Sequence, residues 1–210
     1  EVIMNVDITE GNTGSLAAGA GISSSSGLFG TASYQQRNLG GNNQSLGAEV
    51  QIGERELLFD LSFQDPWIAG DPYRTSYGAN IFRRRSISLV YDGTDTTSIR
   101  TGTRNDSPRI VRTGAGINFS RPLAKDLFSP AEWVLTAGVQ YQHITVQDAD
   151  GNISPRSTDQ FGNQKLAFNA SGVDDLITVR FNATKDDRNS ALEPTSGSLL
   201  LFGMEQTLPF

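Results

Sequence analysis

Apolar and polar residues alternate along most of this chain, and this two-residue period constrains its fold more than any other feature. Successive side chains of a β-strand point to opposite faces, so the period predicts strands with one apolar face and one polar face. The clearest apolar sets are Leu46, Ala48, Val50 and Ile52; Leu57, Phe59, Leu61 and Phe63; and Val111, Thr113, Ala115, Ile117 and Phe119. Either such apolar faces pack together in a soluble sandwich, or they face lipid around a polar lumen.

Turn residues separate the alternating segments and indicate an up-and-down array of about nine strands. We expect the strands at about 15–24, 28–37, 44–53, 55–64, 75–91, 110–120, 133–146, 175–185 and 198–206, after a short strand at 2–8. The predicted fold class is all-β, as a transmembrane antiparallel β-barrel, with the soluble sandwich as the alternative.

Loop and strand lengths favour the membrane alternative. Long polar loops at 92–107 and 147–174 alternate with shorter turns at 38–43, 65–74, 121–132 and 186–197. In an up-and-down array these two sets lie on opposite rims, as in outer-membrane barrels, so we expect the long loops outside the cell and the short turns in the periplasm. Strands of about ten residues suit a tilted membrane-spanning strand. Aromatic residues fall near strand ends, as interface girdles require: Trp67, Tyr73, Tyr77, Tyr91, Trp133 and Tyr141.

Composition narrows the possible classes of function. No apolar run reaches the length of about 18 residues that a transmembrane helix needs. The net charge of −6 argues against nucleic acid as the main partner. The chain has no cysteine, so no disulfide framework holds it together. It begins at Glu1 without a signal segment, and we therefore expect a further N-terminal part.

Three features were weighed as chemical sites. His143 is the single histidine, and without a Ser-His-Asp spacing it is better explained as a polar strand residue than as a catalytic base. Residues 148–152 (DADGN) resemble half of an EF-hand loop but lack its glutamate, which favours a solvated loop tip over weak calcium binding. Arg83, Arg84 and Arg85 favour a solvated rim, with anionic lipid head groups or lumen carboxylates as alternatives. We predict no catalytic residue, metal or cofactor, and no enzyme.

The first strand of the array contains the smallest side chains. Glycine and alanine give little cross-strand contact, so this strand is expected to pair weakly. Its residues are Ser15, Leu16, Ala17, Ala18, Gly19, Ala20, Gly21 and Ile22. Before them, Gly11, Asn12, Thr13 and Gly14 form a turn-rich segment that we interpret as a hinge.

The ordered series of strands and turns resembles the outer-membrane protein insertase superfamily. That superfamily includes BamA, the mitochondrial sorting protein Sam, the chloroplast import channel Toc and two-partner secretion transporters. Val6–Gly30 (VDITEGNTGSLAAGAGISSSSGLFG) is similar to the junction between the last POTRA domain and the first barrel strand. Gln35–Gly47, Phe63–Phe82 and Asp186–Gly203 resemble successive periplasmic turns, so the resemblance covers essentially all 210 residues.

The resemblance implies a domain organisation. Residues 1–10 would be the end of a preceding POTRA domain, and residues 11–210 would be the N-terminal part of a larger, sixteen-stranded barrel. The family's Val-Arg-Gly-Phe/Tyr motif and later strands are absent from the sequence. An open sheet would leave two unpaired edges in lipid, so we expect further barrel strands to follow.

The resemblance also implies a function. The chain would belong to an assembly factor that inserts and folds client barrels through a lateral gate at residues 15–22. Alternatives are a polypeptide secretion or import pore of the same superfamily, a passive porin and a barrel hydrolase. The expected partners are unfolded outer-membrane protein clients, membrane lipids, upstream POTRA domains and C-terminal barrel strands, but no nucleic acid. The expected location is a bacterial outer membrane, of cyanobacterial type, or a chloroplast outer envelope.

Overall fold

The computed structural model describes residues 11–23, 27–87, 100–102, 107–124, 129–157 and 165–209. Within these ranges the chain forms strands, and none of them belongs to a helix that could cross a membrane. The strands are β1 (Gly14–Ser23), β2 (Gly27–Leu39), β3 (Gln44–Gly53), β4 (Leu57–Asp65), β5 (Ser76–Ile87), β6 (Arg109–Leu123), β7 (Trp133–Gln147), β8 (Val173–Asp186) and β9 (Leu199–Pro209). The short strand predicted at 2–8 lies outside the described residues.

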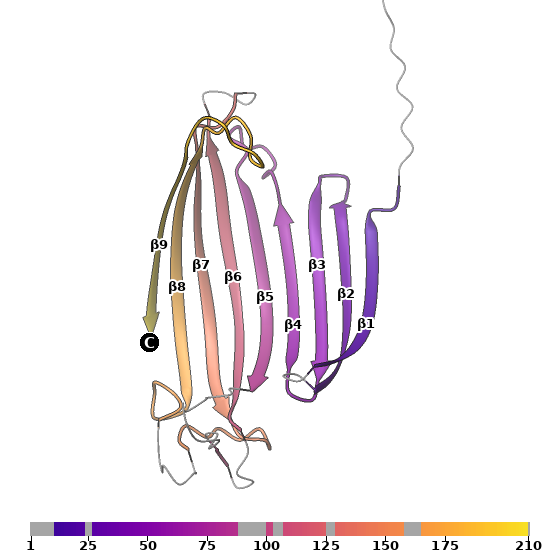
Figure 1. The fold of residues 1–210 in the computed structure, drawn as a ribbon, viewed down its shortest axis with the longest axis vertical. Helices are drawn as coiled ribbons and strands as arrows, with labels where there is room; N and C mark the ends of the chain where they lie inside the picture. Colours follow the sequence, from indigo (N-terminus) through magenta and orange to yellow (C-terminus); the bar gives the residue numbers. More distant parts are fainter. Residues whose placement is uncertain are drawn as a thin grey trace, which may run out of the picture.

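All nine strands form one antiparallel sheet in which each strand pairs with its neighbour in sequence, from β1 to β9 (Figure 1). The predicted all-β, up-and-down array is therefore confirmed. The bounds agree to within about three residues, except at the end of β5, where residues 88–91 lie outside the described part. The alternation found in the sequence is thus the pleat of a single continuous sheet.

Residues that lie opposite each other in neighbouring strands point to the same face of the sheet. Leu61 of β4 lies opposite Ala48 and Ile81, whereas Asp60 lies opposite Glu49 and Phe82. We call the side that contains Leu61 the apolar face and the side that contains Asp60 the polar face. The predicted separation of Leu57, Phe59, Leu61 and Phe63 from Asp60 and Gln64 is confirmed; which face contacts lipid stays a prediction.

The strands of the described residues form a single layer. Only four apolar side chains of the described residues are buried: Phe82, Val111, Val146 and Ala183. Large apolar side chains of the first strand are open, with Leu16 77% and Ile22 84% exposed. A soluble sandwich would bury such side chains between two sheets. The single layer therefore favours the membrane alternative.

The four turns predicted for the periplasm and the two long connections lie at opposite rims of the sheet, and the short β3–β4 turn shares the rim of the long connections (Figure 1). Because successive strands run in opposite directions, the β2–β3, β4–β5, β6–β7 and β8–β9 turns share one rim. The two longest connections, β5–β6 and β7–β8, share the other rim. The predicted segregation is confirmed, and we call these the turn rim and the loop rim.

Side-chain hydrogen bonds shape the β8–β9 turn. Asn189 Oδ1 accepts hydrogen bonds from the N–H groups of Thr195, at 3.0 Å, and Ser196, at 3.1 Å. Arg188 donates from Nε and Nη2 to the two carboxylate oxygens of Asp186, at 2.8 and 2.7 Å. Polar contacts within residues 186–196 thus hold this turn in one conformation.

Carboxylates play the same part in the β4–β5 turn. Asp65 Oδ1 accepts from the N–H of Trp67 at 2.9 Å, and Asp71 Oδ2 accepts from the N–H of Thr75 at 2.6 Å. The indole N–H of Trp67 donates to the carbonyl oxygen of Asp71 at 2.6 Å. Hydrogen bonds from Thr75 lower the pKa of the Asp71 carboxyl below its usual value. The turn is therefore held by the ionised form of Asp71.

The two faces predict opposite environments for two neighbouring residues. A nitroxide at position 61 of the full-length protein in bilayers should collide with oxygen dissolved in lipid, and one at position 62 with a water-soluble nickel chelate. Leu61→Arg should destabilise the barrel by about 2–4 kcal/mol near the bilayer midplane, and Ser62→Arg, on the polar face, much less. The measurements are power-saturation EPR and unfolding in urea. Reversed accessibilities would show that the polar face contacts lipid.

The two rims predict opposite labelling in intact cells. Ala149→Cys at the loop rim should react with a membrane-impermeant maleimide, because we expect that rim to face outward. Leu192→Cys at the turn rim, a residue that is 93% exposed, should react only after lysis. The chain has no native cysteine in its 210 residues to confuse the result. Labelling at 192 without lysis would contradict the orientation.

Candidate functional site

The first strand lies at one margin of the sheet (Figure 1). It pairs with β2 without a bulge, from Gly14 opposite Gln36 to Ser23 opposite Gly27. No described strand pairs with its other side. The outer edge of β1 therefore offers backbone donors and acceptors that the described part of the chain does not use.

The hydrogen-bond pattern shows which backbone groups these are. The N–H of Arg37 donates to the carbonyl oxygen of Thr13 at 2.8 Å, which makes Thr13 and Arg37 a hydrogen-bonded pair. Hydrogen-bonded and non-hydrogen-bonded pairs alternate along an antiparallel ladder. Backbone groups of the intervening residues consequently point away from β2: Gly14, Leu16, Ala18, Ala20 and Ile22.

Small side chains face one another across the β1–β2 seam. Ala18 lies opposite Ala32, and Ala20 lies opposite Gly30. A Cβ added at Gly19 would meet only the Thr31 hydroxyl, at 3.4 Å. Cross-strand contacts are what stabilise a strand pair beyond its backbone, so this seam gains little from side chains.

The predicted hinge is tied to β2 at its end nearest the sheet. Gln36 Nε2 donates to Thr13 Oγ1 at 2.6 Å. Asn12 Oδ1 accepts from the N–H of Gly14 at 3.0 Å, closing a local turn. A Cβ added at Gly11 would meet no other atom within 4 Å. Any hinge movement is therefore freest at Gly11, because Thr13 and Gly14 are held by side chains.

Glycines on the polar face make room for the amide side chains of neighbouring strands. A Cβ added at Gly116 would lie 2.9 Å from Asn80 Oδ1, and one at Gly78 would lie 2.9 Å from Asn118 Oδ1. A shallow cavity of about 470 Å³ on this face is lined in part by Asn80, Asn118 and Asp60. Such a surface of amides and backbone suits a hydrated lumen, and it can hydrogen-bond an extended polypeptide.

Charged groups on the polar face are paired across strands. Arg180 Nε contacts Glu205 Oε2 at 2.7 Å, between β8 and β9. Arg84 Nη2 contacts Asp60 Oδ2 at 3.2 Å, between β4 and β5. These pairs are solvent-exposed, so each contributes little to stability, but they keep opposite charges adjacent along the wall.

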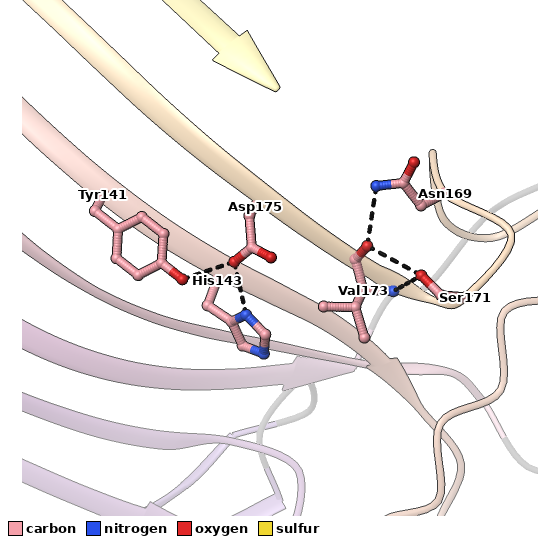
Figure 2. A network of polar contacts seen from close by, with 6 residues as sticks. All are labelled: Tyr141, His143, Asn169, Ser171, Val173 and Asp175. Atoms are coloured by element: carbon pink, nitrogen blue, oxygen red, sulfur yellow. Dashed lines mark hydrogen bonds and ion pairs between the residues drawn. The ribbon is translucent and has the colours of Figure 1, made fainter. Parts of the chain in front are cut away.

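His143 has a partner that sequence spacing did not reveal. Its Nδ1 lies 2.8 Å from Asp175 Oδ1, and the Tyr141 hydroxyl donates to the same oxygen at 2.7 Å (Figure 2). Asp175 comes from the next strand, 32 residues along the chain, and only the β7–β8 register places it there. The described residues contain no cluster of three or more His, Cys, Asp or Glu that could hold a metal. We find no nucleophile hydrogen-bonded to His143 in the described part.

The DADGN segment forms a turn closed by its first residue. Asp148 Oδ1 accepts from the N–H groups of Asp150 and Asn152, both at 2.9 Å. Hydrogen bonds from the Asn152 backbone are the main reason that the pKa of the Asp148 carboxyl is lowered. The carboxylate is engaged by the turn itself, which supports the loop-tip interpretation rather than an EF-hand.

Residues 38–210 match the sequence model of the Omp85 superfamily domain. The chain belongs to the Omp85 superfamily. It is similar to chloroplastic outer envelope protein 80 of Oryza sativa subsp. japonica (32% identity over 217 residues) and of Arabidopsis thaliana (31% over 215). It is also similar to the outer membrane protein assembly factor BamA of Neisseria meningitidis serogroup B (28% over 218). These alignments cover 100% of this chain and 29%, 26% and 24% of the relatives, so the chain spans about a quarter of their length.

The fold agrees with this membership. The crystal structure of BamA from Haemophilus ducreyi lacking POTRA domains 1–3 aligns with a TM-score of 0.56, over 95% of this chain and 35% of that one, at 21% identity. The predicted fold class, part of an outer-membrane-type antiparallel barrel, is confirmed. The predicted location matches the membranes named for the Omp85 relatives: a chloroplast outer envelope and a bacterial outer membrane. The POTRA end predicted at 1–10 lies outside the described residues and stays a prediction.

The seam geometry predicts opposite effects at two glycines of β1. Gly19→Val adds cross-strand contact in open space and should slow amide hydrogen exchange of β1 by about 1.4- to 5-fold, equivalent to about 0.2–1 kcal/mol. Gly21→Val places a Cβ 2.9 Å from the Phe29 ring and should not slow exchange. Exchange measured by mass spectrometry on the full-length protein tests this. Equal slowing by both variants would show that side-chain contact does not limit the seam.

Proposed function

We propose that this chain is part of an outer-membrane protein assembly factor in which β1 forms a lateral gate, pairing with strands of client barrels. The observation that carries the proposal is the run of small side chains in β1, the first strand of the sheet, from Ala17 to Gly21. Membership of the Omp85 superfamily and the similarity to a BamA assembly factor support it.

The gate works through backbone hydrogen bonds. The outward N–H and C=O groups of Leu16, Ala18 and Ala20 can accept an incoming strand as the next rung of the sheet, which is β-augmentation. In lipid an unpaired backbone group costs several kcal/mol, so an opened edge is driven to pair. A nascent client strand supplies the missing partners.

Small side chains allow the seam to open. A strand that closes the barrel would meet Ala17, Gly19 and Gly21 on the polar side of β1 and Ala18 and Ala20 on the apolar side, so the middle of β1 would give it little side-chain contact. Its attachment therefore depends on backbone bonds that a client strand can replace one for one. No catalytic residue, cofactor or nucleotide is needed, and we propose that the protein is not an enzyme.

The proposal includes the surroundings of the gate. Unfolded outer-membrane proteins are the clients, and membrane lipids contact the apolar face. A POTRA domain ends at residues 1–10, and C-terminal strands complete the barrel. The membrane is a bacterial outer membrane or a chloroplast outer envelope.

A second candidate function is a polypeptide translocation pore of the same superfamily. The observation that favours it is the polar face, with its glycines, its amide side chains and its cavity lined by Asn80 and Asn118. An extended chain could pass along that wall while β1 stays closed. The two functions differ in whether the β1 seam opens.

A disulfide across the seam distinguishes the two functions. Ala17→Cys or Gly19→Cys, combined with a cysteine on the closing strand of the full-length protein, should lock the gate. We expect client insertion to stop under oxidising conditions and to recover with reducing agent, because the client needs the edge of β1. Insertion is measured as protease-resistant client barrel in proteoliposomes.

The control disulfide joins β1 to β2 instead. Ala18 and Ala32 form a non-hydrogen-bonded pair, whose Cα atoms lie about 4.5 Å apart, within the range that a disulfide spans. Oxidising Ala18→Cys/Ala32→Cys should leave insertion unchanged, because the outer edge stays free. Full insertion by the locked gate would falsify the insertase proposal. Loss of soluble-polypeptide transport on blocking the lumen would then favour the pore.

A further inference from the structure

The three consecutive arginines of β5 are divided between the two faces of the sheet. Arg84 lies on the polar face, where it pairs with Asp60 and its guanidinium lies 5.2 Å from the ring centre of Phe82. Arg83 and Arg85 point to the apolar face, because side chains alternate along the strand. From the sequence alone, the three arginines are expected together at a solvated rim. The register assigns two of them to the face that is otherwise apolar.

Arg83 begins a row of polar residues that crosses four strands on the apolar face. Thr113 lies opposite Arg83, His143 opposite Thr113, and Asp175 opposite His143. Each of the four lies within four residues of the loop-rim end of its strand. We call these four residues the polar row. It interrupts the apolar face at one level near the loop rim, and Asp65 and Arg121 lie on the same face near the turn rim.

The two arginines have no anionic partner in the described part of the chain. Arg85 Nε is buried and has no hydrogen-bond partner, and no described carboxylate forms an ion pair with Arg83 or Arg85. The nearest acid in the polar row, Asp175, is already bonded to His143 and Tyr141 (Figure 2). Among the described residues, these two cations therefore have no counter-charge.

An apolar groove runs from Arg83 along the apolar face. Its volume is about 560 Å³, and it is lined by Phe59, Ile81, Ala115 and Tyr141, with Arg83 and His143 at its polar end. A groove with aliphatic and aromatic walls and a cation at one end is complementary to an acyl chain attached to an anionic group.

Strand length places the polar row near the edge of the hydrocarbon. About 9–11 residues of a tilted strand cross a bilayer. Strands β5, β6, β7 and β8 have 12, 15, 15 and 14 residues. These strands exceed that length by about one to six residues. The polar row, within four residues of their loop-rim ends, therefore lies towards the edge of the hydrocarbon rather than at its middle.

We propose that Arg83 and Arg85, with the groove beside them, bind a membrane lipid that has an anionic head group. The guanidinium groups bind the phosphate or sulfonate, and one acyl chain lies along Phe59, Ile81 and Ala115. Tyr141, His143 and Asp175 form the polar boundary of the head-group region. The site needs the apolar face to contact lipid, but it does not depend on a gate at β1.

Spin-labelled lipids test the site in the full-length protein. The protein is reconstituted in phosphatidylcholine, and EPR measures the association of spin-labelled phosphatidylglycerol relative to spin-labelled phosphatidylcholine. We expect the wild-type protein to prefer phosphatidylglycerol, and Arg83→Gln/Arg85→Gln to lose that preference, by about fivefold per arginine.

Two further variants separate this site from general charge attraction. Arg84→Gln removes the same charge from the same strand but on the polar face, and it should leave the preference unchanged. Ala115→Trp fills the groove without changing any charge, and it should lower the preference at least about twofold. Heat-modifiable migration on gels confirms that each variant forms a barrel.

The outcomes that overturn the proposal are distinct. Absence of any preference in the wild-type protein overturns it without recourse to a variant. A preference lost equally in Arg84→Gln shows non-specific attraction. If the double variant still prefers phosphatidylglycerol, the two arginines do not bind the lipid. If Ala115→Trp leaves the preference unchanged, the groove does not bind it.

Discussion

The structure depends on one constraint: every backbone N–H and C=O of a strand in lipid must find a partner. The chain meets it with an antiparallel ladder from β1 to β9, in which each strand pairs with its neighbours in sequence and the β2–β3 register shifts once, between Gln36 and Leu39. Because a single layer satisfies the backbone in this way, the fold does not need a conventional core. Few apolar side chains of the described residues are buried, and the turns are held by polar contacts such as those of Asn189 and Asp71.

The same ladder gives the two faces different chemistry. Glycines on the polar face let Asn80 and Asn118 lie close to the backbone, so the wall is smooth and hydrogen-bonding. Leu61 and Ile81 make the opposite face apolar. The polar row is one departure from this pattern, and its position near the loop rim fits the change from acyl chains to head groups. The two faces thus differ in chemistry in the way that we expect of a wall between lipid and a polar lumen, although they share one backbone.

The proposed gate depends on the same requirement that backbone groups in lipid be paired. A strand that must be paired, but gains little from its side chains, can exchange one partner for another at low cost. The middle of β1, from Ala17 to Gly21, suits both conditions, since its small side chains would give little contact to a strand on its outer edge. A gate of this kind would act on other proteins through backbone hydrogen bonds. His143 and Asp175, which look like part of a catalytic set, lie instead in a row on the apolar face.

The sequence by itself determined the strands, their facing and the separation of short turns from long loops, because a period of two residues is a local property of the chain. It also identified β1 as the strand with the smallest side chains. Only the tertiary structure decided which residues are neighbours across strands. The pairing of His143 with Asp175, the bond from Gln36 to Thr13, and the groove beside Arg83 all depend on register. Register is set by hydrogen bonds between segments far apart in sequence, and a shift of one residue would move every side chain to the other face.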